Sequence, residues 1–124
     1  MPETGDNSFK PDKIIDLEGA LVTPGFIDPH THIFPPKDRA NEFSMRVNSS
    51  YEEIAKAGGG ILSSVQACRA ATFEQLMEVN ERNVKRFIAH GTTTLEMKSG
   101  YGLNLETEVL LLEVIRALKL KYSK

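Results

Sequence analysis

The chain has 124 residues, of which 15 are basic and 17 acidic, with a formal net charge of −2 and 40% hydrophobic residues. This composition is ordinary for a soluble globular protein. No basic tract is dense enough to form a phosphate-binding face, so we expect no nucleic acid partner. The longest apolar run, residues 109–112, is too short to cross a bilayer, and the polar N-terminus has no signal-peptide core. We therefore expect no membrane partner either.

The single cysteine, Cys68, excludes an internal disulfide framework and fits a reducing cytoplasm. Its only sequence neighbour that could activate a thiol is Arg69. We expect Cys68 to act as a small buried apolar residue rather than as a reactive thiol. The predicted location of the protein is the cytoplasm.

The first third of the chain is predicted to be mostly extended. Residues 1–13 are expected to be a flexible start, and residues 14–17 form a short strand candidate. An apolar extended pattern then covers residues 21–28 and predicts a second strand. Consecutive prolines at 35 and 36 end regular structure because they remove two backbone donors. Residues 37–50 are mixed and polar, which indicates a loop with a helical turn.

Two helices are predicted in the middle of the chain. The first covers residues 51–57 and ends at the triple glycine of residues 58–60. The second begins after Thr72, which has the spacing of a capping box with Gln75, and ends before Gly91. Its apolar stripe is formed by Phe73, Leu76, Val79, Val84, Phe87 and Ile88.

A strand and a helix complete the predicted order of elements. Residues 92–98, rich in β-branched side chains, predict a strand, and Asn104 is placed to cap a helix over residues 105–120. The side chains expected to face inward from this helix are Val109, Leu112, Ile115, Ala117 and Leu118. The alternation of strand, helices, strand and helix favours an α/β fold with parallel strands.

Two of the three histidines, His30 and His32, are separated by one residue and lie just after the strand predicted over residues 21–28. Residues i and i+2 of a strand project from the same face, so both imidazoles can reach one metal ion. A pair of hydrogen-bonded structural histidines is the alternative interpretation. The third histidine, His90, falls at a helix C-terminus, where a structural capping role is expected. Two histidines fall short of the three protein ligands that a catalytic zinc site needs.

The segment "LVTPGFIDPHTHIF" at residues 21–34 is similar to the first-strand signature of the metal-dependent amidohydrolase superfamily. Four further segments are "DRANEF" at 38–43, "YEEIAKAGGGILSSV" at 51–65, "ATFEQL" at 71–76 and "HGTTTLEMKSGYGLNLETEVLLLEVI" at 90–115. Together they narrow the resemblance to the imidazolonepropionase family. The resemblance extends over residues 21–118, and the combination of motifs is specific where each motif alone is not.

The resemblance implies a (β/α)₈ TIM barrel with a small β-sandwich built from both chain ends. Such a barrel takes about 250 residues, twice the length of this chain. We therefore expect an N-terminal fragment. Residues 1–20 would be a flexible N-terminus with a remnant strand of the β-sandwich, and residues 21–124 would be the first two βα units of an incomplete barrel domain.

Residue by residue, the resemblance implies that His30 and His32 are ligands of zinc or iron. It also implies that Arg39, Tyr51 and Tyr101 bind substrate. A guanidinium can hold the substrate propionate through two parallel hydrogen bonds, and a phenol can pack on a flat ring and donate a hydrogen bond. Solvent exposure for Arg39 and a core position for Tyr51 are the alternatives. Glu96 and Lys98 are given no catalytic role.

The implied activity is metal-assisted hydrolysis of the ring of 4-imidazolone-5-propanoate to N-formimidoyl-L-glutamate, in L-histidine catabolism. The remaining ligands and the general base are expected on strands that this sequence lacks, so the chain alone is expected to be inactive. A homodimer of the full-length protein is left open. The alternatives are a non-catalytic fragment that acts by binding a partner, and another amidohydrolase acting on a cyclic amide.

Overall fold

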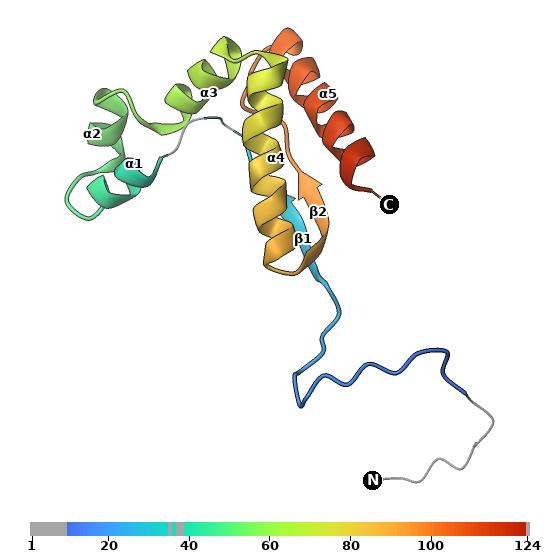
Figure 1. Ribbon diagram of the computed structural model, residues 1–124. Helices are drawn as coiled ribbons and strands as arrows, with labels where there is room; N and C mark the ends of the chain where they lie inside the picture. The colour runs from blue at the N-terminus through green and yellow to red at the C-terminus, as the bar shows by residue number, and fades with distance from the viewer. Residues whose placement is uncertain (1–9, 35, 37–38, 124) are drawn as a thin grey trace.

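The computed structural model describes residues 10–34, 36 and 39–123. In chain order it contains β1 (Phe26–Thr31), α1 (Ala40–Met45), α2 (Tyr51–Lys56), α3 (Gly60–Ala70), α4 (Phe73–Ala89), β2 (Thr92–Met97) and α5 (Leu105–Tyr122). Figure 1 shows β1 and β2 side by side with α4 lying over them, while α1 and α2 project as an arm connected through α3. The α/β class predicted from the sequence is confirmed.

The two strands form one parallel pair, with Phe26 opposite Thr92 and Thr31 opposite Met97. Because the strands are parallel, their C-terminal ends lie at the same edge of the sheet. The ladder begins where the Phe26 N–H donates to the carbonyl oxygen of Gly91 at 2.9 Å. At the other end, the Lys98 N–H donates to the carbonyl oxygen of Thr31 at 2.9 Å.

The bounds of the strand predicted over residues 21–28 were wrong. The sequence predicted a strand over residues 21–28, whereas β1 begins at Phe26 and continues to Thr31, so it includes His30. Residues 21–25 have the composition of a strand, but β2 does not extend far enough to pair with them. The side chains of Leu21 and Val22 are 89% and 70% exposed, so the start of this segment does not pack on the described part of the chain. Strand composition without a partner strand does not make a strand.

No strand forms at residues 14–17, for the same reason. These residues belong to an extended segment, 10–25, that leads away from the helices (Figure 1). The assignment of residues 1–20 to a sandwich remnant stays a prediction, and residues 1–9 lie outside the described ranges. The predicted proline break also falls partly outside them, because Pro35 is not among the described residues.

The end signals of the two long helices are confirmed. Thr72 caps α4: its hydroxyl accepts from the Gln75 N–H at 3.3 Å, and the Gln75 side chain accepts from the Thr72 N–H at 2.9 Å. A cap of this kind stabilises a helix by about 1 kcal/mol. After α4, Gly91 has a φ of +85°, the left-handed conformation expected at a helix end. Asn104 caps α5 by accepting from the Thr107 N–H at 2.8 Å.

The helix predicted over residues 51–57 is confirmed as α2, but α3 was missed. A capping box between Ser50 and Glu53 starts α2, and Gly58, with a φ of +82°, follows its end. The next helix begins directly at Gly60, the last of the three glycines. Glycine is a poor helix residue, and no helix was predicted between the triple glycine and Thr72. Tertiary burial of Ser64, Val65 and Cys68 outweighs that preference.

One hydrophobic core lies between the sheet and the helices α3, α4 and α5. It consists of Ile33, Phe34, Cys68, Leu76, Val84, Leu111, Val114 and Leu118. The prediction that Val109 and Leu112 face inward was wrong, because both are exposed and the buried face of α5 is formed by Leu111, Val114 and Leu118. Leucines and valines occur on both faces of this helix, so periodicity alone could not choose the buried one.

Large apolar side chains also remain exposed on the strands, including Phe26 and Ile27. Strands of a parallel sheet are normally covered on both faces, and here α4 covers one. A search of the described residues finds no helix long and apolar enough to cross a membrane.

A carboxylate on α4 connects this helix to the end of α5. Glu81 accepts hydrogen bonds from the Lys121 ammonium and the Tyr122 hydroxyl, both at 2.8 Å, and pairs with Lys85 at 2.9 Å. The hydrogen bonds from Lys121, Lys85 and Tyr122 lower the pKa of Glu81 to about 2. The ionised carboxylate therefore favours the docked position of α5.

We expect Glu81→Gln to lower the thermal midpoint of the chain by roughly a few degrees at pH 7 and by progressively less as the pH falls toward 2. The pKa is depressed in the folded state, so this contribution is complete above the ordinary value of 4.5 and is lost as the pH falls toward about 2. Circular dichroism melts between pH 7 and pH 2 measure the difference. The matched control is Glu78→Gln, since Glu78 pairs only within α4, with Arg82. An equal loss in both variants at pH 7 would contradict the assignment.

Candidate functional site

The histidine pair lies at the C-terminal end of β1. His30 is in the strand and His32 directly follows it. Exposed and buried residues alternate here: His30 and His32 are exposed, whereas Thr31 and Ile33 are buried toward the helices. This alternation is the two-residue period of extended chain. Both imidazoles therefore lie on the sheet face opposite the core, and they share one face as the sequence predicted.

The two rings converge. The Nε2 atoms of His30 and His32 are 3.1 Å apart, and the ring centroids are 4.9 Å apart with an interplanar angle of 77°. Two nitrogens that each bind one tetrahedral zinc at about 2.0–2.1 Å are roughly 3.3–3.4 Å apart. The observed separation thus fits two ligands of a single ion. A hydrogen bond between a protonated and an unprotonated ring nitrogen gives the same distance, so both interpretations of the pair stay open on geometry alone.

No third ligand completes the pair within the described ranges. No group of three or more His, Cys, Asp or Glu side chains there could hold a metal ion. Asp28, two residues before His30, accepts the His30 backbone N–H at 3.2 Å and so stabilises the local chain. His90 lies at the other end of the sheet, where its Nδ1 donates to the carbonyl oxygen of Arg86 at 2.7 Å, consistent with its predicted capping role.

Glu96 is next to the histidine pair, on β2. Its neighbours in the strand, Leu95 and Met97, pack on the core, which directs Glu96 to the opposite face. One carboxylate oxygen lies 4.0 Å from Nδ1 of His30 and accepts the Thr31 N–H at 3.4 Å, while the other lies 3.4 Å from the Lys98 ammonium. Carboxylates beside metal-binding histidines commonly fix the ring orientation. Sequence reasoning gave Glu96 no catalytic role, and its two-residue alternation with Lys98 was the available signal.

Tyr101 contacts the pair from the loop that follows β2. Its ring centroid is 5.3 Å from that of His32, with an interplanar angle of 76°, an edge-to-face arrangement. The parallel pairing of the strands explains this contact, because both C-terminal ends meet at one edge. Among the residues singled out from the sequence, Tyr101 is the one that touches a candidate metal ligand.

Glu108 on α5 holds that loop and was not identified from the sequence. Its carboxylate accepts the backbone N–H groups of Gly100, Gly102 and Leu103 at 2.7, 2.7 and 3.0 Å. Burial acts to raise the pKa of Glu108, but the hydrogen bonds from Leu103, Ser99, Gly100 and Gly102 together lower it. Glu108 lies four residues after the helix-capping Asn104, and this spacing forms no pattern that would have revealed the contact.

Arg39 precedes α1 and is anchored by Glu42. Its Nε and one terminal nitrogen lie 2.8 and 2.7 Å from the same Glu42 oxygen, which also accepts the Gly60 N–H at 3.0 Å. The hydrogen bond to Glu42 raises the pKa of Arg39 against the opposing effect of burial, and nearby Tyr101 and Tyr51 act in the same direction. The structure thus brings Arg39 near both tyrosines. Asp38, the first residue of the "DRANEF" motif, lies outside the described residues.

Tyr51 begins α2 and is about half exposed, so the alternative of a core position is not what the structure has. The guanidinium of Arg46 lies 5.8 Å from the centre of its ring. Cys68, by contrast, is fully buried in the core, and burial raises the pKa of its thiol to about 11. The prediction that Cys68 is a buried apolar residue is confirmed.

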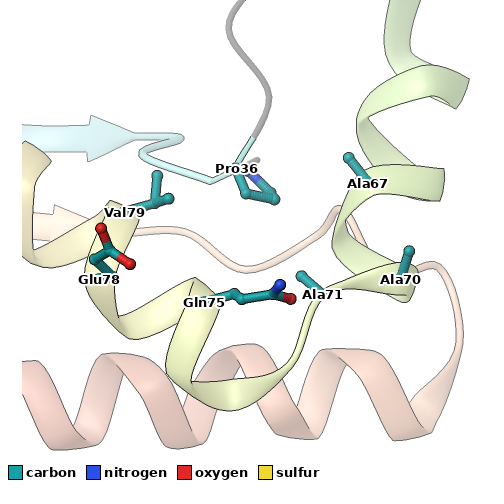
Figure 2. Close-up of a pocket in the computed structure, with 7 residues that line it drawn as sticks. All are labelled: Pro36, Ala67, Ala70, Ala71, Gln75, Glu78 and Val79. Atoms are coloured by element: carbon teal, nitrogen blue, oxygen red, sulfur yellow. The ribbon is translucent and has the colours of Figure 1, made fainter.

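A separate depression lies at the junction of α3 and α4 (Figure 2). It is lined by Pro36, Ala67, Ala70, Ala71, Gln75, Glu78 and Val79. Three of these side chains are single methyl groups, and Figure 2 shows Glu78 and Gln75 on the adjoining turns of α4. None of the predicted site residues lines this depression. The candidate site is therefore the rim at the ends of β1 and β2.

Comparison with known proteins places this arrangement in a family. A family model described as the amidohydrolase family matches residues 13–64. The imidazolonepropionase of Vibrio parahaemolyticus is 55% identical over 106 residues, covering 85% of this chain and 26% of that protein. The imidazolonepropionase of Hahella chejuensis is 49% identical over 112 residues, covering 90% of this chain and 28% of that protein. That of Paracoccus denitrificans is 57% identical over 102 residues, covering 82% of this chain and 26% of that protein.

The chain spans about a quarter of the length of the curated relatives it matches. Identity near one half over more than four fifths of the chain confirms the resemblance found in the motifs. The family implies a metal cofactor, in accord with the convergent ring nitrogens of His30 and His32. These 124 residues are therefore similar to the amidohydrolase family over residues 13–64, and over most of their length they are similar to imidazolonepropionases.

Proposed function

We propose that this chain supplies part of the active site of a metal-dependent hydrolase that opens the ring of 4-imidazolone-5-propanoate. Water is added across a ring C–N bond, and the product is N-formimidoyl-L-glutamate, a step of L-histidine catabolism. One observation carries the proposal: the two histidines whose Nε2 atoms are 3.1 Å apart lie inside the stretch that matches the amidohydrolase family. The high identity to imidazolonepropionases supports this substrate over other cyclic amides.

In this proposal His30 and His32 bind zinc or iron, and further ligands come from outside the 124 residues. When bound, the metal activates water for attack on the ring carbonyl. Neutral imidazoles suit either metal, so the histidine pair does not determine whether zinc or iron binds. Glu96, 4.0 Å from Nδ1 of His30, helps to hold the first ring in position. The general base is likewise assigned to a part of the protein beyond this chain.

Arg39 binds the propionate group of the substrate. A guanidinium has five N–H donors, and Glu42 engages Nε and one terminal nitrogen of Arg39 through a single oxygen. The other donors can form two parallel hydrogen bonds to a second carboxylate. Since Glu42 also accepts the Gly60 N–H, the guanidinium is oriented before the substrate arrives. Orientation in advance reduces the entropy lost on binding.

Tyr51 and Tyr101 line the substrate pocket. Both lie close enough to Arg39 to affect its pKa, and Tyr101 also contacts His32. A flat imidazolone ring held between the metal and Arg39 would therefore lie beside Tyr101. The phenol can pack on the ring and donate a hydrogen bond to it.

The fold of the whole protein follows from the same proposal. Residues 21–124 form the first two βα units of a (β/α)₈ barrel, and residues 1–20 belong to the β-sandwich. The exposed apolar residues of β1, such as Phe26 and Ile27, then face further barrel elements. A homodimer is an option for the full-length protein.

In the protein at the length of its relatives, His30→Ala and His32→Ala should each lower the bound metal below half and reduce turnover by more than about 100-fold. The reason is that removing a metal ligand should lower metal affinity and activity more than mutating an outer-shell residue, which costs roughly 10–100-fold. Elemental analysis and a ring-opening assay provide the two measurements. His90→Ala is the matched control and should keep both metal and activity. Full activity in either of the first two variants would refute the metal assignment.

Arg39→Lys should raise KM by about 10- to 100-fold with little change in kcat, because lysine cannot form the paired hydrogen bonds to a carboxylate. Steady-state kinetics with the natural substrate measure this. A ring analogue without the carboxylate should be turned over equally by both proteins. Arg82→Lys, on the exposed side of α4, is the control. If KM stays constant in Arg39→Lys, the carboxylate is held elsewhere.

In this proposal the general base and further metal ligands come from outside the 124 residues, so the chain by itself should give no measurable ring opening. Purified chain, prepared from a host that lacks its own imidazolonepropionase, is assayed for formimidoylglutamate with added zinc or iron. Detectable product that scales with protein concentration would contradict this.

A further inference from the structure

The loop between β2 and α5 is held by an unusually concentrated set of hydrogen bonds. Three of its backbone N–H groups, those of Gly100, Gly102 and Leu103, point at the carboxylate of Glu108. One carboxylate oxygen accepts from the Gly100 N–H, and the other accepts from the Gly102 and Leu103 N–H groups. Hydrogen bonds to an ionised acceptor are about twice as strong as neutral ones. The loop is therefore fixed on both sides of Tyr101.

A second contact holds the same loop from α3. The Nε of Arg69 donates to the carbonyl oxygen of Gly102 at 2.7 Å, so both backbone polar groups of Gly102 are bonded to charged side chains. Gly102 is buried, and a Cβ there would lie 2.8 Å from the Glu108 nitrogen. Leu103 adopts a φ of +51°, a conformation that a leucine rarely takes unless other contacts impose it.

These contacts are not needed to start α5. The Asn104 side chain already caps the helix through the Thr107 N–H at 2.8 Å. Glu106, in the same first turn, is exposed and takes no part in holding the loop. The carboxylate of Glu108 is instead turned back toward residues 99–103. Its placement serves the loop, and the side chain that the loop presents to the histidine pair is Tyr101.

We propose that Glu108, assisted by Arg69, is a positioning residue that sets the place of Tyr101 beside His32 and thereby the fit of the substrate ring. The proposal rests on the proposed function, in which Tyr101 lines the substrate pocket. Neither Glu108 nor Arg69 contacts the substrate in this scheme. Both act through the backbone on either side of Tyr101, and the effect is on binding.

The variant that tests this is Glu108→Gln, which keeps the side-chain length but replaces one accepting oxygen by an NH₂ group. It must lose either the Gly100 bond or the Gly102 and Leu103 pair. In the protein at the length of its relatives, KM should rise by about 10-fold, as expected for one lost charge-assisted hydrogen bond, with kcat changed less than about 3-fold. Glu106→Gln removes the same charge from the same turn and should leave KM unchanged.

A double-mutant cycle separates positioning from general loss of structure. If Glu108 acts through Tyr101, then Glu108→Gln should add less than about 2-fold to KM in a Tyr101→Ala background. An undiminished effect in that background would overturn the proposal. Should Glu108→Gln fail to fold, Arg69→Met removes the second contact, at the Gly102 carbonyl oxygen, and should raise KM in the same way.

A second measurement does not depend on activity. Amide hydrogen exchange followed by NMR on the 124-residue chain should accelerate at least about 10-fold at Gly100, Gly102 or Leu103 in Glu108→Gln, and not in Glu106→Gln. Equal exchange in the two variants would overturn the inference. If the unsubstituted full-length protein does not open the ring, the proposed function and the inference both fail. If it does, and Glu108→Gln leaves KM unchanged, the inference alone fails.

Discussion

The parallel pairing of β1 with β2 is the constraint on which the rest of this site depends. Residues 30 and 101 are far apart in the chain, and the crossover between the strands contains four helices. Parallel pairing places the two C-terminal strand ends at one edge, so that the segment after β1 and the loop after β2 become neighbours. The contact between His32 and Tyr101 follows directly from this. An antiparallel arrangement would have placed them at opposite ends of the sheet.

The two faces of the sheet carry different kinds of side chain. One face carries Thr31, Ile33, Leu95 and Met97 and packs on the helices, which bury the core. The other carries the histidines and Glu96, so polar and titratable groups are kept away from the core and can converge on a ligand. Within the described residues, this second face is open. The two imidazoles have no third ligand among the described residues, and in the proposed function they are one part of a larger metal site.

How far the sequence predicted this structure depends on how local each signal is. The helix ends at Thr72, Gly91 and Asn104 were correct because capping depends on residues within one turn. The bounds of β1 were wrong because a strand also needs a partner, which the local sequence does not contain. The buried face of α5 was misassigned because apolar residues occur on both sides of the helix. α3 was missed because it begins at the last of three glycines.

For the proposed site, the sequence identified the candidate metal ligands and substrate-binding residues and did not identify the carboxylates beside them. Histidines two residues apart, an arginine in a motif and a tyrosine between two glycines are recognisable from residue type and spacing. Glu108 and the contact of Glu42 with Gly60 are not, because the partners are backbone N–H groups, which every residue except proline possesses. A residue that donates only its backbone N–H can be of any type except proline, so the sequence does not reveal it as a partner. Such contacts can be found only once the chain has folded and shown which N–H groups lack a helix or sheet partner.

These three carboxylates share one physical role at the rim. Each lies beside a candidate site residue and accepts a backbone N–H: Glu42 from Gly60, Glu96 from Thr31 and Glu108 from Gly100. In the proposed function this edge admits a substrate, so apolar side chains cannot cover it and hydrophobic packing is not available to fix its loops. Charge-assisted hydrogen bonds fix the same backbone without covering the edge. The negative charge of Glu42 lies next to the Arg39 guanidinium and stabilises its positive charge, and Glu96 lies beside the pair that would bind the metal cation in the proposed function.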